Sequence, residues 1–195
     1  MDILKLYRFM DILPNVISGS QSAFVSNRLI SDNNTVTFEF LHRMRNKRTR
    51  KKWQVAIKLD ISKTYDHVEW EFLQQIMLEL GIDDRWVCLA METIHTTSYS
   101  VLINGEAKGY MTPSRGIKQG NPLLPYLFLL CAEGLSSLIK KAIKSQQLHW
   151  ILSCTNGVCI SHHLFADDSF IFCQSTMEEG VDLLEILGHD EVALG

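Results

Sequence analysis

The chain has 195 residues, of which 46% are hydrophobic and 21% charged, and its formal net charge is −3. This length suits one domain with a sizeable core, and the composition excludes a low-complexity chain. The longest nearly apolar run, at residues 122–132, is too short to span a bilayer, and residues 1–15 lack the pattern of a secretory signal peptide. We therefore expect an intracellular protein, nuclear or cytoplasmic, that is neither secreted nor membrane-bound.

The cysteines have no regular spacing and form no CxxC pair: Cys88, Cys131, Cys154, Cys159 and Cys173. Their odd number favours reduced, mostly buried thiols. A zinc site made from Cys154, Cys159, His162 and Cys173 is the alternative, but structural zinc sites usually contain close ligand pairs. We therefore do not expect zinc.

The chain opens with a loop-rich region that leads into a basic segment. Residues 14–34 are rich in small and polar types and predict a loop with short structured pieces, and residues 35–44 favour a helix. Seven of the nineteen Lys and Arg residues then fall within residues 43–52, RMRNKRTRKK. Either a solvated loop or a contact with nucleic-acid phosphates explains this run, and charge alone does not choose between them.

The middle of the chain alternates between strand and helix signals. The segment WQVAIKLDI, residues 53–61, alternates apolar and polar positions and predicts a strand. Residues 68–81 and 83–95 predict two helices, the second capped by Asp83. An Asn-Gly turn within NGEAKG predicts that residues 98–116 form a β-hairpin.

The last third begins with the longest predicted helix, residues 121–145, with Asn121 as its cap and Pro122 at its first position. HLFADDSFIFC, residues 163–173, predicts a hairpin with two aspartates at its tip. Residues 175–188 predict a final helix capped by Ser175 or Thr176. Strands interleaved with helices indicate an α+β fold.

Two sets of carboxylates end apolar strands: Asp60 in one, and Asp167 and Asp168 in the other. An isolated buried carboxylate is costly, and converging carboxylates repel each other unless they hold a cation. If the strands are neighbours, these residues predict a Mg²⁺ site suited to phosphoryl transfer. Gln119 and Gly120 precede a helix, where backbone amides can approach a nucleotide. Structural aspartates at turns and an ordinary capped loop remain the alternatives.

Three segments, in this order and spacing, resemble motifs A, B and C of reverse transcriptases: KLDISKTYDHVEW, GIKQGNPLLPYLFLLCAEGLS and HLFADDSFIFC. The similarity is greatest to plant non-LTR (LINE-type) retrotransposons. The upstream segment LPNVISGSQSAFVSNRLISDN also resembles the finger block of that family. The resemblance implies a right-hand polymerase palm, an antiparallel sheet backed by helices, with part of the fingers. Residues 1–53 would be the partial fingers with the basic run and 54–195 the palm, in a truncated chain whose thumb is missing.

Metal binding and catalysis are the first roles that the resemblance implies. Asp60, Asp167 and Asp168 would be catalytic and, with the backbone carbonyl of Ile61, would hold Mg²⁺ or Mn²⁺. The turn at Phe165 and Ala166 matches the tight turn of motif C.

Substrate contacts are also implied. Tyr65 would be the steric gate against a ribose 2′-hydroxyl, Gln119 and Gly120 would contact the nucleotide, and Arg28 would approach its triphosphate or the template. The partners would be an RNA template, a DNA primer and a dNTP. Contacts with the nucleic-acid backbone would come from Arg45, Lys47, Arg48, Arg50, Lys51 and Lys52.

Several positions depart from the family pattern: Thr64 replaces an alanine, Asn121 an aspartate and Leu124 a serine. Asn121 loses a negative charge at the helix start. These departures and the missing segments favour an alternative, a catalytically inactive retrotransposon remnant that retains the palm fold. A third hypothesis, a phosphohydrolase or nuclease, would need further His or Glu ligands that the apolar strands lack.

Overall fold

Three antiparallel strands form the central sheet: β1 (Gln54–Asp60), β7 (Asp168–Gln174) and β6 (His162–Phe165), in that order in space. The computed structural model describes residues 3–46, 53–60, 66–117, 122–152, 159–165 and 168–194. Strand β1 pairs with β7 along its whole length, from Gln54 opposite Gln174 to Asp60 opposite Asp168. Strand β6 pairs with the first half of β7, so β7 is the middle strand.

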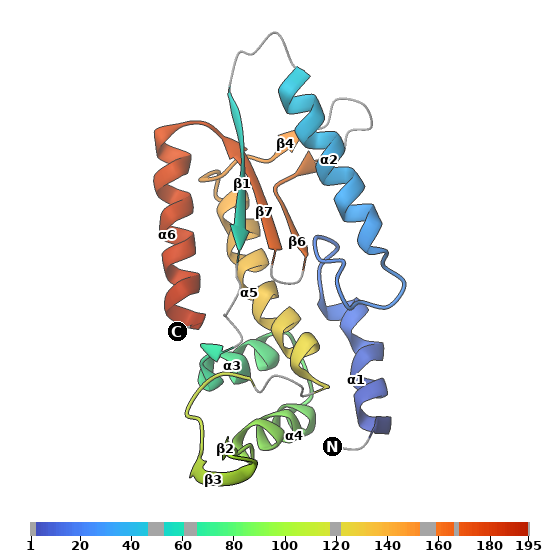
Figure 1. The fold of residues 1–195 in the computed structure, drawn as a ribbon. Helices are drawn as coiled ribbons and strands as arrows, with labels where there is room; N and C mark the ends of the chain where they lie inside the picture. The colour runs from blue at the N-terminus through green and yellow to red at the C-terminus, as the bar shows by residue number, and fades with distance from the viewer. Residues whose placement is uncertain are drawn as a thin grey trace.

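The helices lie around this sheet as Figure 1 shows, with α5 behind it, α6 along one edge and α2 along the other. Helices α3 and α4 lie below the sheet, and α1 lies beside the lower end of α5. Their bounds are α1 (Ile3–Val16), α2 (Ile30–Asn46), α3 (Trp70–Glu79), α4 (Asp84–His95), α5 (Leu124–Lys144) and α6 (Met177–Leu194). The predicted α+β architecture is therefore confirmed.

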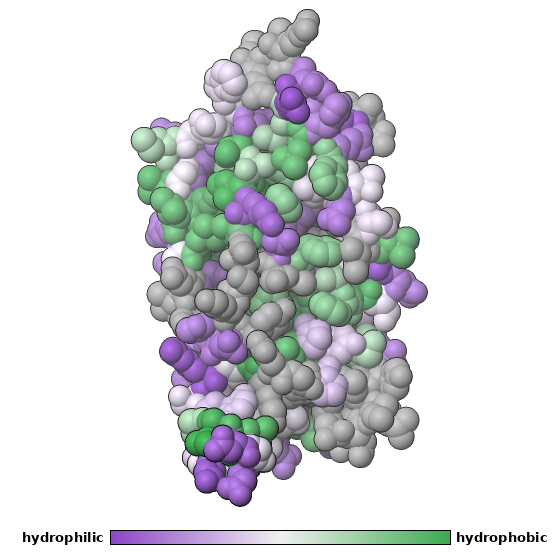
Figure 2. All heavy atoms as spheres, viewed as in Figure 1, coloured by the Kyte–Doolittle hydropathy of each residue, from purple (hydrophilic) through white to green (hydrophobic). Residues whose placement is uncertain are grey.

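Side chains on the two faces of the sheet belong to different cores. Because side chains alternate along a strand, Ile57 and Ile171 pack with Leu135 of α5 and Leu183 of α6. On the opposite face, Phe172 packs against Phe40 of α2, with ring centroids 5.4 Å apart. Figure 2 shows hydrophobic residues gathered over the upper part of this second face. The lower end of the same face, where β1 ends and β7 begins, carries Asp168.

A larger core joins the helices below the sheet. It contains Leu13 of α1, Leu73 of α3, Met91 of α4 and Leu127 of α5, all buried. This core includes α1, which the sequence analysis did not predict. Among the described residues, no helix is long and apolar enough to cross a membrane.

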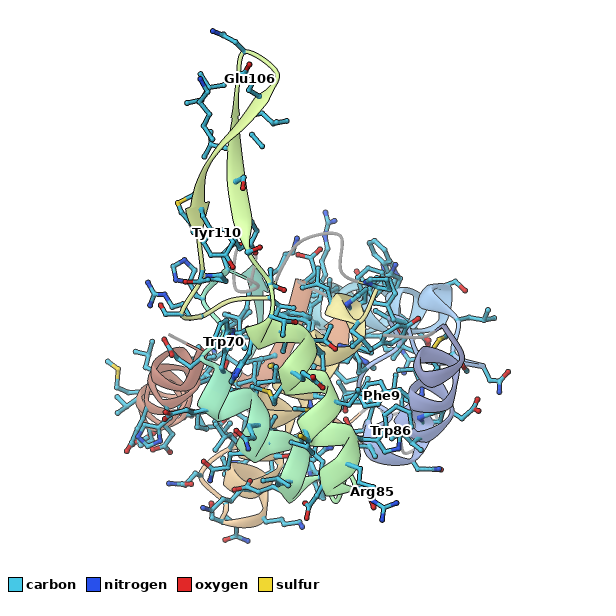
Figure 3. The ribbon with its side chains drawn as sticks, turned by 90° about the horizontal axis from the view of Figure 1, so that it is seen from below. Phe9, Trp70, Arg85, Trp86, Glu106 and Tyr110 are labelled. Atoms are coloured by element: carbon cyan, nitrogen blue, oxygen red, sulfur yellow. The ribbon has the colours of Figure 1, made fainter. Side chains whose placement is uncertain are left out.

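A β-hairpin projects from this body, made of β2 (Tyr99–Ile103) and β3 (Glu106–Met111), as Figure 3 shows with Glu106 near its tip. The predicted Asn-Gly turn is confirmed: both Asn104 (φ 53°) and Gly105 (φ 84°) have positive φ, as a type I′ turn requires. Strand β3 ends at Met111, earlier than predicted. A second, short pair is β4 (Ile151–Leu152) with β5 (Cys159–Ile160).

Helix starts were predicted with mixed success. Asp83 caps α4 as expected, because its side chain accepts a hydrogen bond from the Arg85 amide at 3.0 Å. Thr176 Oγ1 likewise accepts from the Glu179 amide at 3.2 Å. The predicted start of the longest helix is wrong: α5 begins at Leu124, with Leu123 at the N-cap and Pro125 in the first turn. Pro125 also fits an early helical position, so Pro122 is not needed there.

Gly116 joins the segment before α5 to the segment before α3. Its amide donates to the Val68 carbonyl at 2.8 Å, and its carbonyl accepts from Trp70 Nε1 at 2.8 Å. Its φ is +81°, and a Cβ placed there would lie 2.6 Å from the backbone oxygen of Asp66. Only glycine therefore fits at this contact.

We expect Gly116→Ala to lower the free energy of unfolding by about 2–4 kcal/mol, because strain and a backbone clash act together. Gly109→Ala is the matched control, since φ is +75° there but nothing lies within 4 Å of the added Cβ. It should cost only about 1 kcal/mol. Urea unfolding of both variants measures the difference, and equal losses would contradict the importance of this contact.

Candidate active site

Two of the predicted carboxylate positions meet where β1 ends and β7 begins. Asp60 and Asp168 are directly paired across the two strands, and Phe165 of β6 is paired with Asp168 on the other side. Directly paired positions in an antiparallel sheet share one face. Positions 60 and 168 therefore lie together at one end of the sheet face that α5 and α6 do not cover.

A lysine occupies the same face beside these positions. The Nζ of Lys58 lies 2.8 Å from Oδ1 of Asp168, and both side chains are about half exposed. An exposed pair of this kind contributes at most about 1 kcal/mol. The contact nevertheless places a positive charge beside the Asp168 carboxylate. Carboxylate oxygens are also the ligands that Mg²⁺ prefers, and Asp168 is the predicted ligand whose side chain the structure describes.

Several predicted site residues lie outside the described residues: Asp167, Ile61, Tyr65, Gln119, Gly120, Lys47, Arg48, Arg50, Lys51 and Lys52. Thr64, Asn121, Cys154 and Ala166 are also outside them. In the part of the chain that the structure describes, no group of three or more His, Cys, Asp or Glu residues could hold a metal ion. The roles expected of these residues remain predictions.

The residues that flank the segment expected to contact the nucleotide are described. Ile117, on one side of residues 118–121, is 2% exposed, and Leu123, on the other side, is 3% exposed. Gly116 is tied to Val68 and Trp70 as described above. The described residues on both sides of this segment are therefore held by burial or by hydrogen bonds.

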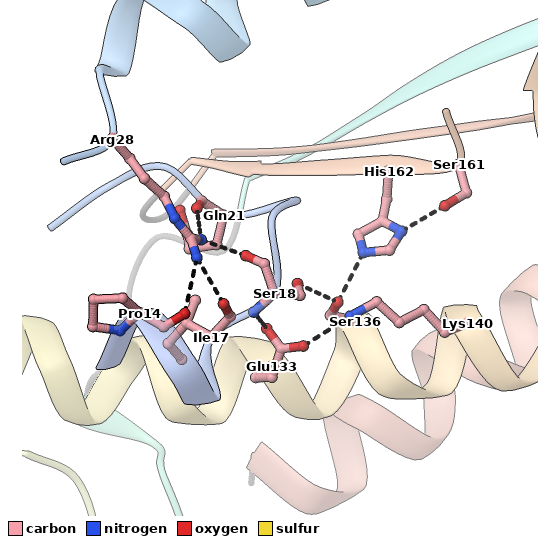
Figure 4. Close-up of polar contacts among 10 residues, drawn as sticks. All are labelled: Pro14, Ile17, Ser18, Gln21, Arg28, Glu133, Ser136, Lys140, Ser161 and His162. Carbon is pink, nitrogen blue, oxygen red and sulfur yellow. Dashed lines mark hydrogen bonds and ion pairs between the residues drawn. The ribbon is translucent and has the colours of Figure 1, made fainter. Parts of the chain in front are cut away.

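Arg28, predicted to approach a nucleotide, points into the protein. Figure 4 shows its guanidinium group donating to the carbonyls of Ile17 at 2.8 Å and Gln21 at 2.6 Å, and to those of Ser18 and Pro14. These four hydrogen bonds thus stabilise the backbone conformation of residues 14–21. This geometry favours a structural role for Arg28, which the sequence pattern did not reveal.

A buried polar network connects the same loop to α5 and β6. Glu133, whose side chain is 5% exposed, accepts from the Ser18 amide at 3.0 Å and from Lys140 Nζ at 3.0 Å. Ser136 Oγ lies 3.1 Å from Ser18 Oγ and 2.9 Å from His162 Nε2 (Figure 4). Because His162 begins β6, this network fixes the strand that leads to the aspartate turn. Sequence analysis missed it, since its members are far apart in the chain.

The ionisation of His162 follows from its position. Burial, with a smaller effect of the nearby Lys140 and His163, lowers the pKa of His162 to about 4. The imidazole is therefore neutral at pH 7, and its two nitrogens lie 2.9 Å from the hydroxyls of Ser136 and Ser161. A neutral ring can accept from one hydroxyl and donate to the other.

We expect the contribution of this histidine to the free energy of unfolding to be acid-sensitive. Its folded pKa of about 4 lies below the ordinary 6.5, so its stabilisation is fully present above pH 6.5 and is lost as the pH falls towards 4. Relative to His162→Gln, the wild type should lose about 2–3 kcal/mol of unfolding free energy over that range. Urea unfolding at each pH measures this, with the exposed His67→Gln as control. A difference that does not change with pH would contradict the expectation.

The fold and the paired aspartates define an α+β protein of the polymerase palm class. The family model described as "Reverse transcriptase (RNA-dependent DNA polymerase)" matches residues 3–191. The chain therefore belongs to the reverse transcriptase family.

Relatives agree with this assignment. An uncharacterized mitochondrial protein of Arabidopsis thaliana is 50% identical over 68 residues, which are 35% of this chain and 56% of that protein. A Pol polyprotein from the type-1 retrotransposable element R2 of Popillia japonica is 30% identical over 94 residues, covering 48% of this chain and 16% of that protein. The predicted kinship with non-LTR retrotransposons is confirmed. This chain spans about half of the first relative and a sixth of the second.

A solved structure shares the fold. The apo telomerase of Candida tropicalis, truncated from its C-terminal domain, matches with a TM-score of 0.60 at 15% identity. The match covers 96% of this chain and 36% of the telomerase chain. At this identity the likeness shows the fold alone.

Proposed function

We propose that this chain is the core of an RNA-directed DNA polymerase. The observation that carries the proposal is the cross-strand pairing of Asp60 with Asp168 in a chain of the reverse transcriptase family. In the reaction, the 3′-hydroxyl oxygen of a DNA primer bonds to the α-phosphorus of a dNTP opposite an RNA template. The bond to pyrophosphate breaks, and the hydroxyl proton is released.

Asp60, Asp167 and Asp168, with the carbonyl of Ile61, would hold Mg²⁺ or Mn²⁺. Such ions, when bound there, would supply activation of the attacking oxygen and stabilisation of the leaving one. Lys58 supports this assignment, because its contact with Asp168 at 2.8 Å reveals a position that accepts positive charge. The sheet holds the backbone of Asp60 and Asp168 in a fixed register, which favours binding of a cation with little reorganisation.

The remaining residues would orient the substrates. Tyr65 would exclude a ribose 2′-hydroxyl, and Gln119 with Gly120 would contact the nucleotide from the segment between the buried Ile117 and Leu123. Arg45, in the last turn of α2, is exposed and begins the basic residues that would contact the nucleic-acid backbone. These residues also include Lys47, Arg48, Arg50, Lys51 and Lys52.

An inactive remnant that retains the palm fold is the second candidate. It is favoured by the departures from the family pattern at Asn121 and Leu124. Asn121 in place of the expected aspartate removes a negative charge from the segment before α5, and neither departure changes the proposed metal ligands.

Primer extension on an RNA template separates the two candidates. With Mg²⁺ or Mn²⁺, the wild type should extend a DNA primer, and Asp60→Asn and Asp168→Asn should lower the rate at least about 100-fold, because each removes a charge that holds the metal. Glu185→Gln, an exposed acid on α6, is the control and should keep the wild-type rate.

Circular dichroism and urea unfolding must show that each variant is folded before the rates are compared. If the folded wild type incorporates no nucleotide at any metal concentration, the polymerase proposal fails and the inactive remnant remains. Equal extension by wild type and Asp168→Asn would instead contradict the assignment of the metal ligands.

A further inference from the structure

A cavity of about 380 Å³ lies where three helices meet, away from the paired aspartates. Figure 1 shows α6 descending along α5 until its last turns approach α3. Apolar side chains of two helices form most of the wall: Phe72, Ile76 and Leu80 of α3 and Leu138 of α5. This volume lies within the range of sites that bind small molecules.

A glycine keeps space open beside this wall. A Cβ at Gly134 of α5 would lie 3.2 Å from Cζ of Phe72, which is tighter than an ordinary van der Waals contact. The bare backbone therefore lets the Phe72 ring lie against α5 as part of the wall. Ser137, one turn further along α5, also lines the cavity and is exposed at its rim.

Asp190 of α6 contributes a charge to this apolar space. It lines the cavity and is 7% exposed, and no described residue forms a hydrogen bond or an ion pair with its carboxylate. Burial raises its pKa to about 6, so it is mostly ionised at pH 7.5. A buried carboxylate without a partner is costly, and a cation within the cavity would remove that cost.

The groups that face Asp190 do not supply this cation. From α3, Glu79 lines the cavity and adds a second negative charge at its edge. From α5, the buried thiol of Cys131 has a raised pKa, caused by burial and then by the charge of Asp190, and it stays neutral. On α6 itself, the neighbouring His189 lines the cavity but is exposed to solvent. The cavity is therefore apolar with a negative charge inside and another at its edge.

We propose that this cavity binds small organic ammonium ions, with the ammonium group beside Asp190 and the apolar part against Phe72, Ile76 and Leu138. Charge pairing beside an apolar wall favours such a ligand over a neutral molecule of the same shape. Helices α3 and α6 follow the segments of motifs A and C, and α5 contains most of motif B, so a bound cation would bridge the three helices. This site does not depend on polymerase activity.

Binding of benzylammonium to the full chain tests the proposal, with benzyl alcohol as the neutral probe of similar shape. Calorimetric titration at pH 7.5 should show that wild type binds benzylammonium at least tenfold more tightly than benzyl alcohol. Asp190→Asn should bind benzylammonium at least tenfold more weakly than wild type. The result that overturns the proposal is equal affinity of wild type for the two probes, or a loss of less than twofold in Asp190→Asn.

The pH gives a second readout, because benzylammonium keeps its charge between pH 5 and pH 7.5. At pH 5, one unit below the pKa of Asp190, only about one carboxyl in eleven is ionised, so wild-type affinity should fall about tenfold. Any effect of His189 persists in Asp190→Asn, which therefore serves as the reference. An equal fall in wild type and Asp190→Asn would overturn the role of Asp190.

Two further variants control for folding and location. Ser137→Trp places a bulky ring at the exposed rim without changing charge, and it should weaken benzylammonium binding at least fivefold. Glu185→Gln lies on α6 but does not line the cavity, and it should bind as wild type does. Unchanged binding by Ser137→Trp would locate the ammonium ion elsewhere and overturn the proposal. Urea unfolding confirms beforehand that each variant is folded.

Discussion

The pairing of β1 with β7 is the constraint on which the rest of the structure depends. Its register places Asp60 opposite Asp168, and the same register turns Ile57 and Ile171 towards α5 and α6. A slip of one residue would move the apolar side chains into solvent and the carboxylate positions into the core. Burial of the apolar residues therefore determines where the acidic positions lie, and no separate interaction between the carboxylates is needed to align them.

Helix α5 connects the central sheet to the first part of the chain through hydrogen bonds. Its polar residues Glu133 and Ser136 are buried and satisfied by partners from the loop at Ser18 and from His162 of β6. A partly satisfied network would destabilise the core. In this network, Ser18, Lys140 and His162 supply the hydrogen-bond partners of Glu133 and Ser136. The position of the loop is thus coupled to the strand that leads into the aspartate turn, although the two are more than a hundred residues apart.

Local features were predicted from the sequence where a short-range rule decides the outcome. The Asn104-Gly105 turn, the cap at Asp83 and the alternation of β1 depend on neighbouring residues only. The start of α5 was wrong because Pro122 and Pro125 both satisfy the rule for an early helical position. The partners of Arg28 could not be predicted, since they are backbone carbonyls whose directions depend on the folded loop.

In the candidate site, too, some features were predictable from the sequence and others were not. The motif order identified the carboxylate positions, and the strand register brings Asp60 and Asp168 together. The contact between Lys58 and Asp168 joins residues far apart in the chain, and no local pattern marks it. The same is true of Asp190, which looks like an ordinary polar residue in a helical sequence. Its burial arises only when α3 and α5 pack against α6.

Two buried titratable groups affect stability in opposite directions as the pH changes. Asp190 has a pKa raised to about 6, above its ordinary 3.8, so its unfavourable contribution grows as the pH rises through that range. His162 has a pKa lowered to about 4, so its unfavourable contribution grows as the pH falls from 6.5. Between pH 4 and 6 the two effects largely cancel, and stability should vary little with pH. At neutral pH only the cost of the ionised Asp190 carboxylate remains, and a cation bound beside it would offset that cost.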